Sequence, residues 1–591
     1  DMYSAENAGL VKFDFLGLKT LTVINNTQKL VKKIDKNFDI ENIDYEDQKV
    51  FDLLSSGNTV GLFQVESAGM REALVQMKPN HIEDIIALVA LYRPGPMSNI
   101  PIYNDCKHGK QTPDYLHPLL EDILKPTYGV IIYQEQVMQI AQKLSGFTAG
   151  QADLLRRAMG KKKRAELEKQ KQGFIEGAVK NGIAKDVAAG IFLKIEPFAE
   201  YGFNKSHAAA YAIISYQTAF LKTYYPKEFI AASMTMDISN QNKLSEFYEE
   251  LKRLKVDVVR PDINECFADF RTIDNKFYYA LGGIKAVGYE AISNVIKERK
   301  MNGKFQSIND FLNRVNPKDM NKLQLEGLVK AGAFDSINTN RQSLFDSIPN
   351  FITKTKNIFE NRSTNQIDLF SEDENLENNI INEIDDWKFE ERLSKEFEAV
   401  GFFISDHPLN QFTEIFDDYK ITEYSNFNSN DEIREANIAA TLLKIQERKT
   451  AKGNSYAVLK LTDLSSVFEL FIFSDILELN REILKEGSSL LLTLVKNISN
   501  DENRFKRVNV QKIGSLIDLF NSPIKEVYFD VNNDENLETI SKILNEDGKT
   551  KIYFNMKLND KNLKFKLKKT RNLDRKSLNL LRKREISSTI I

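Results

Sequence analysis

Hydrophobic positions along the chain follow two different periods. From about 31 to 250 they recur with 3.6-residue spacing, as in "HIEDIIALVALY", "YQEQVMQIAQKL" and "AAAYAIISYQTAFLKTYY", which predicts a mostly helical region. The breakers "RPGPM" and "KPTYG" separate these helices. Farther on, "NIAATLLKIQERK", "SYAVLKLTDLSS", "VFELFIFSD" and "SLLLTLVKNI" are short β-patterned runs bounded by turn residues. About five strands in roughly 80 residues predict a small barrel, and the last 70 residues predict a mixed α/β module.

One apolar run near the start contains a charged residue in an unexpected place. In "AGLVKFDFLGLKTLTVI", Val11 and Phe13 alternate onto one face of a predicted strand, which leaves Lys12 and Asp14 on the other face. Burying a carboxylate costs several kcal/mol unless something pairs with it. Asp14 is therefore either the partner of Lys12 at a solvated strand end or a metal ligand that needs further carboxylates.

Composition narrows the class of protein. The 591 residues, 42% hydrophobic and 28% charged, indicate a globular protein of several domains. No run of about 18 apolar residues exists, so we expect no membrane span. The start has no initiator Met and no signal pattern, and we expect it to be the interior of a longer protein. Cys106 and Cys266 are the only cysteines, as expected for a reducing, cytoplasmic location without a disulfide framework.

The net charge of −3 hides segregated blocks of opposite sign. Residues 154–171 carry eight Lys/Arg against two Glu, and residues 557–584 carry twelve against two Asp. Residues 368–391 carry ten acidic residues and one Lys. Such blocks indicate local surfaces for a polyanion.

Two motifs of the helical region suit phosphate. In "ADLLRRAMGKKK", the paired forks of Arg156 and Arg157 suit triphosphate oxygens, although a solvated basic helix end is an equally ordinary interpretation. In "EYGFNKSHAAAYA", a polar turn enters an alanine-rich helix, and we predict Ser206 as its N-cap, with amides that suit an anion. A third stretch, "GLFQVESAGMR", puts Gln64, Ser67 and Arg71 before another helix.

Two further segments suit DNA. "LGGIKAVGYEAISNVI" (281–296) has the form of a helix–hairpin–helix, in which Gly283 and Gly288 bracket a turn whose amides can hold a DNA phosphate. The alternative is a generic glycine turn. The barrel is similar to an oligonucleotide-binding (OB) fold, with "IQERKTAKGNSYAVL" as a hairpin with a basic loop.

Several long motifs, in order, resemble the bacterial replicative DNA polymerase III alpha subunit family. They are "AGLVKFDFLGLKTL", "GLFQVESAGMREAL", "IALVALYRPGPM", "YGVIIYQEQVMQIAQKLSGFTAGQADLLRRAMGKK" and "EYGFNKSHAAAYAIISYQTAFLK". With the helix–hairpin–helix, linker and barrel in the same order, the resemblance covers essentially the whole chain. It implies a template-directed DNA polymerase that adds deoxynucleotides to a primer 3′ end in chromosomal replication.

The resemblance implies a metal role for Asp14. Asp14 matches the third of three palm aspartates that hold two Mg²⁺ ions for nucleotidyl transfer, with Lys12 beside it as a phosphate contact. The other two lie upstream in the family, and only 13 residues precede Asp14 here. We therefore expect this fragment to be inactive alone. The alternatives are a non-catalytic module that binds DNA and tethers the clamp, and an error-prone paralogue of the same family.

The fold class implied is multidomain α+β: mostly helical fingers with a helix–hairpin–helix, then an OB barrel and a small α/β module, with only the last strand of a polymerase beta-like palm. The domain boundaries predicted are 1–30 for the end of the palm, 31–254 for the fingers, 255–345 for the helix–hairpin–helix region, 346–395 for a flexible linker, 396–432 for a connecting segment, 433–515 for the OB fold and 520–591 for the C-terminal module.

The resemblance also assigns site residues and partners. Nucleotide binding falls to Arg156, Arg157, Asn204, Lys205, Ser206 and His207, and DNA binding to Lys161, Lys162, Lys163, Gly283, Ile284, Lys285 and Gly288. The linker pentapeptide Gln366, Ile367, Asp368, Leu369 and Phe370 matches the sliding-clamp (beta) motif, whereas a look-alike at 515–520 is expected to pack in the fold. Other implied partners are primer–template DNA, deoxynucleoside triphosphates and the clamp-loader tau subunit. The proofreading epsilon subunit would bind only the upstream region.

Overall fold

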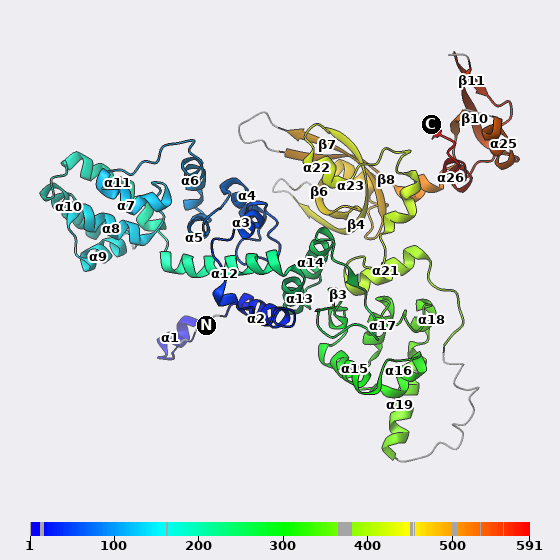
Figure 1. Cartoon of the computed structure of the whole chain (residues 1–591), viewed down its shortest axis with the longest axis horizontal. Helices are drawn as coiled ribbons and strands as arrows, with labels where there is room; N and C mark the ends of the chain where they lie inside the picture. The colour runs from blue at the N-terminus through cyan, green and yellow to red at the C-terminus, as the bar shows by residue number, and fades with distance from the viewer. Residues whose placement is uncertain are drawn as a thin grey trace. The chain divides into compact units, whose positions relative to one another are not determined.

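The chain folds into two compact units of mixed α and β structure (Figure 1). One consists of residues 1–283 and 287–304, the other of residues 284–286 and 305–591. The computed structural model describes residues 2–11, 13, 17–160, 164–364, 381–449, 453, 455–498, 506–531, 534–558 and 561–590. None of the described helices combines the length and the apolar character that crossing a bilayer requires.

The first unit is mostly helical, as the 3.6-residue spacing predicts. Its only described sheet is small, with the strand order β1-β3-β2. The elements in chain order are α1 (Met2–Asn7), α2 (Lys19–Val31), η1 (Ile40–Asn42), α3 (Gln48–Ser55), α4 (Ala68–Met77), α5 (Ile82–Leu91), η2 (Pro96–Asn99), α6 (Ile100–Lys107), η3 (Pro118–Leu120), α7 (Glu121–Leu124), η4 (Lys125–Thr127), α8 (Gln134–Ser145), α9 (Ala149–Gly160), α10 (Arg164–Lys180), α11 (Lys185–Tyr201), α12 (Lys205–Tyr224), α13 (Pro226–Met236), α14 (Gln241–Arg253), β1 (Val258–Val259), β2 (Arg271–Ile273), β3 (Lys276–Tyr278), η5 (Leu281–Gly283) and α15 (Tyr289–Asn302).

Helix α12, the long green helix in Figure 1, is central to the first unit. It packs against α2, α3, α5 and α13. Ala208, Ala212 and Ala219 are fully buried along it, and small side chains let neighbouring helices approach closely. A separate core, in which Phe174 and Phe192 are fully buried, joins α8, α9, α10 and α11 into a bundle. The chain returns from this bundle directly into α12 at Asn204.

The predicted strand near the start is absent from the described residues. Val11 and Phe13 have no strand conformation and are 75% and 76% exposed, and the helix after them, α2, begins at Lys19. A strand buries its apolar face only when neighbouring strands pair with it. The described part of this unit offers only the β1-β3-β2 sheet, which does not pair with Leu10, Val11 or Phe13.

The second unit begins with helices and continues into two sheets. Its elements are α16 (Ile308–Arg314), α17 (Lys322–Lys330), α18 (Arg341–Asp346), α19 (Ile348–Thr364), α21 (Phe389–Val400), η7 (Pro408–Ile415), α22 (Tyr424–Ser429), β4 (Glu435–Lys449), β5 (Ser455–Thr462), β6 (Val467–Phe473), α23 (Ser474–Asn480), β7 (Ser489–Ile498), β8 (Lys506–Ser515), α24 (Leu516–Asn521), β9 (Glu526–Val531), α25 (Asp534–Ile543), β10 (Asp547–Leu558), β11 (Lys561–Lys566), α26 (Arg575–Lys583) and β12 (Ser588–Ile590).

The predicted flexible linker over 346–395 is wrong at both of its ends. Helix α19 covers Ile348–Thr364, and α21 begins at Phe389. Ile348 and Phe351 are buried where α19 packs against α16 and α17. Apolar residues at i and i+3 form one helical face. The linker was predicted from the polar composition of the whole segment, and this apolar spacing was not considered.

Five antiparallel strands form the predicted β-rich region. Their order is β6-β5-β4-β7-β8, with β8 also against β6, so the sheet curls on itself. The predicted hairpin is confirmed, because Lys449 pairs with Ser455 across the turn between β4 and β5. Its core lies on the inner face, where Leu459, Leu470 and Leu492 are buried.

The C-terminal module combines helices with a four-stranded sheet of order β11-β10-β9-β12. The look-alike segment before it, residues 515–520, lies in α24 except for Ser515, which is the N-cap of this helix. Leu516 is fully buried there and Phe520 packs on Phe412 with ring centroids 5.7 Å apart, whereas Ile517 is 40% exposed. The expectation that this segment packs in the fold holds for Phe520 and is wrong for Ile517.

Candidate functional site

The amino end of α12 begins in the polar turn singled out in the sequence. Its N-cap is Asn204, whose side-chain oxygen accepts a hydrogen bond from the His207 N–H at 2.8 Å. The predicted N-cap, Ser206, lies one residue inside the helix and is exposed. An Asn side chain at the position before the first helical residue reaches the third N–H of the helix, so the cap falls two residues earlier than predicted.

Glu135, in the first turn of α8, ties this turn to the bundle. Its carboxylate accepts from the Asn204 side-chain amide at 2.8 Å and from the Lys205 N–H at 3.1 Å. The Lys205 ammonium lies 3.1 Å from a carboxylate oxygen of Glu83 and 5.3 Å from the ring centroid of Tyr133. Both ion-paired side chains keep more than a third of their surface exposed, so the charge on Lys205 stays accessible to a ligand.

Aromatic rings surround His207. Its imidazole lies 4.4 Å from the ring of Tyr211 and 5.5 Å from that of Phe203, measured between centroids. The guanidinium of Arg93 lies over the ring of Phe203, 4.4 Å from its centroid. Arg93 comes from "RPGPM", which the sequence offered only as a helix breaker. A cation and tilted aromatic rings therefore flank the turn, and Arg93 is a candidate residue that sequence reasoning missed.

Arg156 and Arg157 lie near the end of α9, and both pair with Asp153. Nη2 of Arg156 and Nε of Arg157 each lie 2.8 Å from one of its two carboxylate oxygens. The hydrogen bond from Arg156 is the main cause that holds the pKa of Asp153 below its usual value. Arg157 keeps 62% of its side chain exposed, against 28% for Arg156. Arg157 is thus the more available fork for an anion.

Gln134 connects the two predicted nucleotide motifs. Its side-chain oxygen accepts from Arg156 Nη1 at 3.2 Å, while its amide nitrogen donates to the Gly202 carbonyl at 3.0 Å. Its backbone N–H donates to the carbonyl of Phe203, next to Asn204. The structure therefore brings Arg156 and the turn at 204–207 to one region of the first unit.

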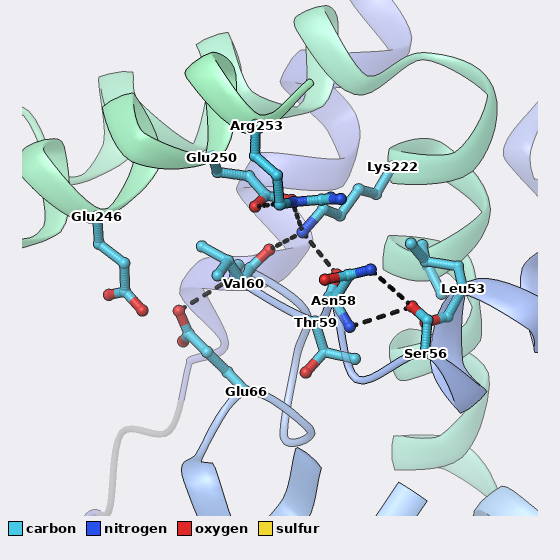
Figure 2. Close-up of polar contacts among 12 residues, drawn as sticks. Leu53, Ser56, Asn58, Thr59, Val60, Glu66, Lys222, Glu246, Glu250 and Arg253 are labelled. Carbon is cyan, nitrogen blue, oxygen red and sulfur yellow. Dashed lines mark hydrogen bonds and ion pairs between the residues drawn. The ribbon is translucent and has the colours of Figure 1, made fainter. Parts of the chain in front are cut away.

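The carboxyl end of α12 carries a buried polar cluster of a different kind (Figure 2). The Lys222 ammonium donates to the carbonyls of Asn58 and Val60 at 2.9 and 2.8 Å and pairs with Glu250 at 2.7 Å. Arg253 donates to both oxygens of Glu250, at 2.8 and 2.7 Å. The Lys222 side chain is 1% exposed, and burial lowers its pKa to about 8 although Glu250 opposes the shift. This cluster holds the loop before α4.

That loop, residues 56–67, contains Gln64 and Ser67 of the "GLFQVES" stretch. Gly61 has φ +80°, and a Cβ there would lie 2.7 Å from the Phe247 ring, so glycine is required. Gln64 also has a positive φ, 64°, which is uncommon for a residue with a Cβ. With α2, α13 and α14 the loop lines a pocket of about 340 Å³. Ser67 is the N-cap of α4, so its hydroxyl is used structurally.

The two glycines of the predicted helix–hairpin–helix lie on either side of the turn between η5 and α15. Gly283 ends η5 and is buried, and Gly288 is the N-cap of α15. Between them Ile284 is buried, and the Lys285 N–H donates to the carbonyl of Ala399 at 2.8 Å. The Lys285 amide is therefore already used, which leaves fewer amides of the turn for a DNA phosphate. The N–H groups of residues 286–288 have no hydrogen-bond partner among the described residues.

The outer face of the curled sheet exposes aromatic side chains. Phe471 and Phe473 on β6 are 53% and 49% exposed. The guanidinium of Arg507, on β8, lies 5.7 Å from the ring centroid of Phe473. Exposed rings next to a cation suit the faces of unpaired bases.

Several predicted site residues lie outside the described residues: Lys12, Asp14, Lys161, Lys162, Lys163, Gln366, Ile367, Asp368, Leu369 and Phe370. Among the residues that are described, no three His, Cys, Asp or Glu side chains converge on a point that could hold a metal ion. The described part of the chain therefore gives no geometry for the Mg²⁺ ions that the resemblance implies.

Two family models match the chain at the two helical regions just described. Residues 20–182 match the bacterial DNA polymerase III alpha subunit finger domain, and residues 255–344 match a helix-hairpin-helix motif. The finger match contains the arginines of α9, and the motif match contains the turn between Gly283 and Gly288.

Curated relatives extend the similarity over most of the chain. The DNA polymerase III subunit alpha of Borreliella burgdorferi is 38% identical over 597 residues, covering 98% of this chain and 52% of the relative. That of Caulobacter vibrioides is 42% identical over 507 residues, covering 85% and 44%. That of Rickettsia bellii is 40% identical over 600 residues, covering 95% and 50%. The chain belongs to the DNA polymerase III alpha subunit family and spans about half the length of these relatives.

Proposed function

We propose that this chain forms the finger, helix–hairpin–helix and C-terminal regions of a template-directed DNA polymerase that extends primer 3′ ends in chromosomal replication. The observation that carries the proposal is the identity of 38% to the Borreliella alpha subunit across 98% of the chain. The finger and helix–hairpin–helix matches, in that order, support it. The reaction would join a deoxynucleotide to the primer 3′-OH and release pyrophosphate.

In this proposal the incoming nucleotide lies near the amino end of α12. Arg157 and Arg156 would contact the triphosphate, because planar guanidinium forks match phosphate oxygens and Asp153 already orients both of them. Lys205, 39% exposed, would add a further charge. Asn204 would act mainly by capping the helix, while Ser206 and His207 are exposed and near enough in sequence to face the same ligand.

Divalent metal chemistry would fall to Asp14 and its carboxylate partners. Two Mg²⁺ ions would neutralise the triphosphate and lower the pKa of the primer hydroxyl. Lys12 would assist as a phosphate contact. Asp14 is one carboxylate, and two hard cations need several oxygen ligands, so we expect the 591 residues on their own to be inactive.

Primer extension by a chimera tests the catalytic proposal. The chain would replace the matched half of the Borreliella relative, and extension with Mg²⁺ and all four nucleotides would be followed on a labelled primer. We expect the chimera to extend the primer, its Asp14→Ala variant to lose turnover by orders of magnitude with DNA affinity nearly intact, and the chain alone to give no product. Equal extension by the chimera and by its Asp14→Ala variant would contradict the role of Asp14. Extension by the chain alone that Asp14→Ala abolishes would contradict its inactivity.

DNA binding is proposed to be sequence-independent and mainly electrostatic. The contributing parts are the basic segment 154–171, the turn at 283–288 and the five-stranded curled sheet, which would act as an OB fold. Log affinity should fall linearly with log salt. Replacing Lys161, Lys162 and Lys163 by Ala should flatten that line. An unchanged slope would remove this cluster from the DNA path and favour the solvated-face interpretation.

Clamp binding is proposed to reside in the pentapeptide 366–370. Leu369 and Phe370 would be apolar anchors in a groove of the sliding clamp, with Gln366 adding a directional hydrogen bond. Leu369→Ala with Phe370→Ala should abolish clamp binding in surface plasmon resonance without changing stability. Leu519→Ala with Phe520→Ala, in the half-buried look-alike, is the matched control and should retain clamp binding. Parental affinity in the first variant would show that 366–370 is not the tether.

The C-terminal module is proposed to contact the clamp-loader tau subunit, and epsilon would bind only upstream sequence. If the chimera fails to extend primers while the chain still binds DNA and the clamp, the non-catalytic tethering module becomes the better description. The error-prone paralogue would be favoured by a chimera that extends past damaged template bases.

A further inference from the structure

The four-stranded sheet of the C-terminal module carries its hydrophobic core on one face only. Val527, Phe529 and Ile552 are buried there with residues of α25 and α26, such as Ile540 and Leu578. Side chains alternate between the two faces along a strand. The other face therefore carries the residues in between, which are Glu526, Tyr528, Asp530, Lys551, Tyr553, Asn555, Lys564 and Lys566.

Two tyrosines stack at the centre of this opposite face. Tyr528 and Tyr553 are direct neighbours in the parallel pair β9–β10. Their ring centroids lie 4.5 Å apart, with 8° between the ring planes. Both residues are half-buried, so part of each residue stays open to solvent.

Two lysines of the edge strand β11 lie on these rings. The ammonium of Lys564 is 4.1 Å from the centroid of Tyr528 and 5.6 Å from that of Tyr553. The ammonium of Lys566, which pairs in register with Tyr553, is 5.8 Å from its centroid. The two lysines therefore extend the tyrosine pair toward the edge of the sheet.

The acidic groups of the face are engaged elsewhere. Glu526 pairs with Lys551 at 2.7 Å, and Asp530 accepts a hydrogen bond from Asn555 at 2.9 Å. Among the described residues, neither Lys564 nor Lys566 has an ion-pair partner. The segment around them, residues 557–584, has twelve Lys/Arg against two Asp. The pKa of Glu526 is lowered mainly by the hydrogen bond from Lys551 and also by the charges of Lys566 and Lys564. Neither Lys564 nor Lys566 forms an ion pair with it, and both are exposed.

We propose that this face, named here the tyrosine–lysine face and defined by Tyr528, Tyr553, Lys564 and Lys566, binds single-stranded nucleic acid. The phosphates lie along the lysines of β11, and unpaired bases pack against the tyrosines. Charge complementarity selects a polyanion, and the rings select bases that are free to stack. An acidic peptide would satisfy the lysines and gain nothing from the rings. The inference rests on the C-terminal module alone and does not require the polymerase proposal.

Oligothymidine binding to the full chain tests the proposal. The probe is a fluorescent 20-nucleotide oligothymidine, and anisotropy gives its affinity over a range of salt concentrations. Lys564→Ala with Lys566→Ala should reduce the slope of log affinity against log salt by about 1.4, because each single-strand phosphate contact contributes about 0.7. Lys576→Ala with Lys583→Ala is the matched control, since both lysines are exposed and lie on α26 of the opposite face. The control should leave the slope unchanged.

Photo-cross-linking separates this face from the other DNA-binding parts of the chain. An oligothymidine containing 5-bromodeoxyuridine should cross-link to peptides that contain Tyr528 or Tyr553, and a twofold excess of duplex should not remove these cross-links. The proposal would be overturned if the Lys564/Lys566 variant kept the parental slope of log affinity against log salt, or if both lysine variants lost the same amount of slope. It would also be overturned if no cross-link formed to the peptides that contain Tyr528 or Tyr553. Polyglutamate at the same concentration of negative charge as the oligothymidine is a further competitor. If it removes these cross-links, the proposal is overturned and the face binds an acidic protein instead.

Discussion

The two ends of α12 present polar residues in opposite ways. At the amino end, Lys205 and its partner Glu83 keep 39% and 38% of their side chains exposed. At the carboxyl end, Lys222 and Glu250 keep 1% and 5%. Both ends contain a lysine paired with a glutamate at about hydrogen-bond distance. The comparison shows that an ion pair alone does not mark a functional site, because the same pair of residue types is exposed at one end, where we propose a ligand, and holds a buried loop at the other.

Burial decides which role each pair has. A buried charge is costly unless it is paired and hydrogen-bonded. The Lys222 ammonium has two carbonyls and one carboxylate as partners. An exposed charge is already solvated, so Lys205 can exchange Glu83 for a phosphate at little cost. We therefore expect substitutions at the carboxyl end to lower stability and those at the amino end to lower ligand affinity.

The largest effect is expected from Glu250→Ala. The substitution leaves the Lys222 ammonium buried without its carboxylate, and should lower the free energy of unfolding of the first unit by about 3–5 kcal/mol. Native-state hydrogen exchange of α12 and α14 amides measures this unit separately, as required for a chain of several domains. Glu83→Ala is the matched control at the other end and should cost less than about 1 kcal/mol. Equal costs would erase the distinction between the two ends.

The next effect is a pH dependence that belongs to Lys222. Its pKa in the fold is about 8, against 10.5 for an ordinary lysine. Between these pH values the unfolded state keeps a proton that the folded state has released, so this group makes stability rise with pH. The rise should total about 3 kcal/mol, at 1.36 kcal/mol for each unit between the two pKa values. It is complete above pH 10.5 and absent below pH 8.

Lys222→Met isolates this contribution. The difference in free energy of unfolding between the parent and the variant should change between pH 7 and pH 10.5, because methionine does not titrate. Parallel curves for the two proteins would mean that Lys222 keeps an ordinary pKa in the fold.

The amino end of α12 could be predicted from the sequence because its signals are local. The polar residues and the alanine-rich helix lie within one short stretch, although the structure places Lys205, Ser206 and His207 in the first turn of α12 and only Asn204 before it. The cap was misplaced by two residues, since Asn204 and Ser206 are both good N-caps and only the start of the helix decides between them. The partners Glu135 and Glu83 come from other helices and carry no local signal.

The carboxyl end could not be predicted in the same way. Lys222 lies in a stretch, "AFLKTYY", that carries no motif, and its carbonyl partners are more than 160 residues away. Long-range contacts of this kind appear only after the helices pack. The strand that was predicted near the start and the helix α19 that was not predicted have a related cause, because alternation or composition was weighed without the neighbours that each element packs against.

A smaller effect is expected from Asn204→Ala. Losing the cap exposes the first N–H groups of α12 without a partner and should cost about 0.5–2 kcal/mol in the first turn. Hydrogen exchange of the His207 amide reports it directly. Ser206→Ala is the control and should leave that amide unchanged, since its hydroxyl is not the cap. Faster exchange in the Ser206 variant alone would restore the cap originally expected.

The smallest effect on stability, and the sharpest test of the comparison, is expected from Lys205→Ala. Its ion pair with Glu83 is exposed, so the free energy of unfolding should fall by less than about 1 kcal/mol. A charged hydrogen bond to phosphate contributes about 1.5–3 kcal/mol, so the same substitution should raise the KM for deoxynucleotides in the chimeric polymerase by roughly tenfold or more. Lys194→Ala is the matched control. Lys194 lies on α11, its side chain is 58% exposed, and its ammonium pairs with Asp114 at 2.9 Å. If both variants change KM alike, the effect reflects net charge rather than a site. If Lys205→Ala instead lowers stability as strongly as Glu250→Ala, the amino end holds the fold together in the same way as the carboxyl end, and the distinction between them fails.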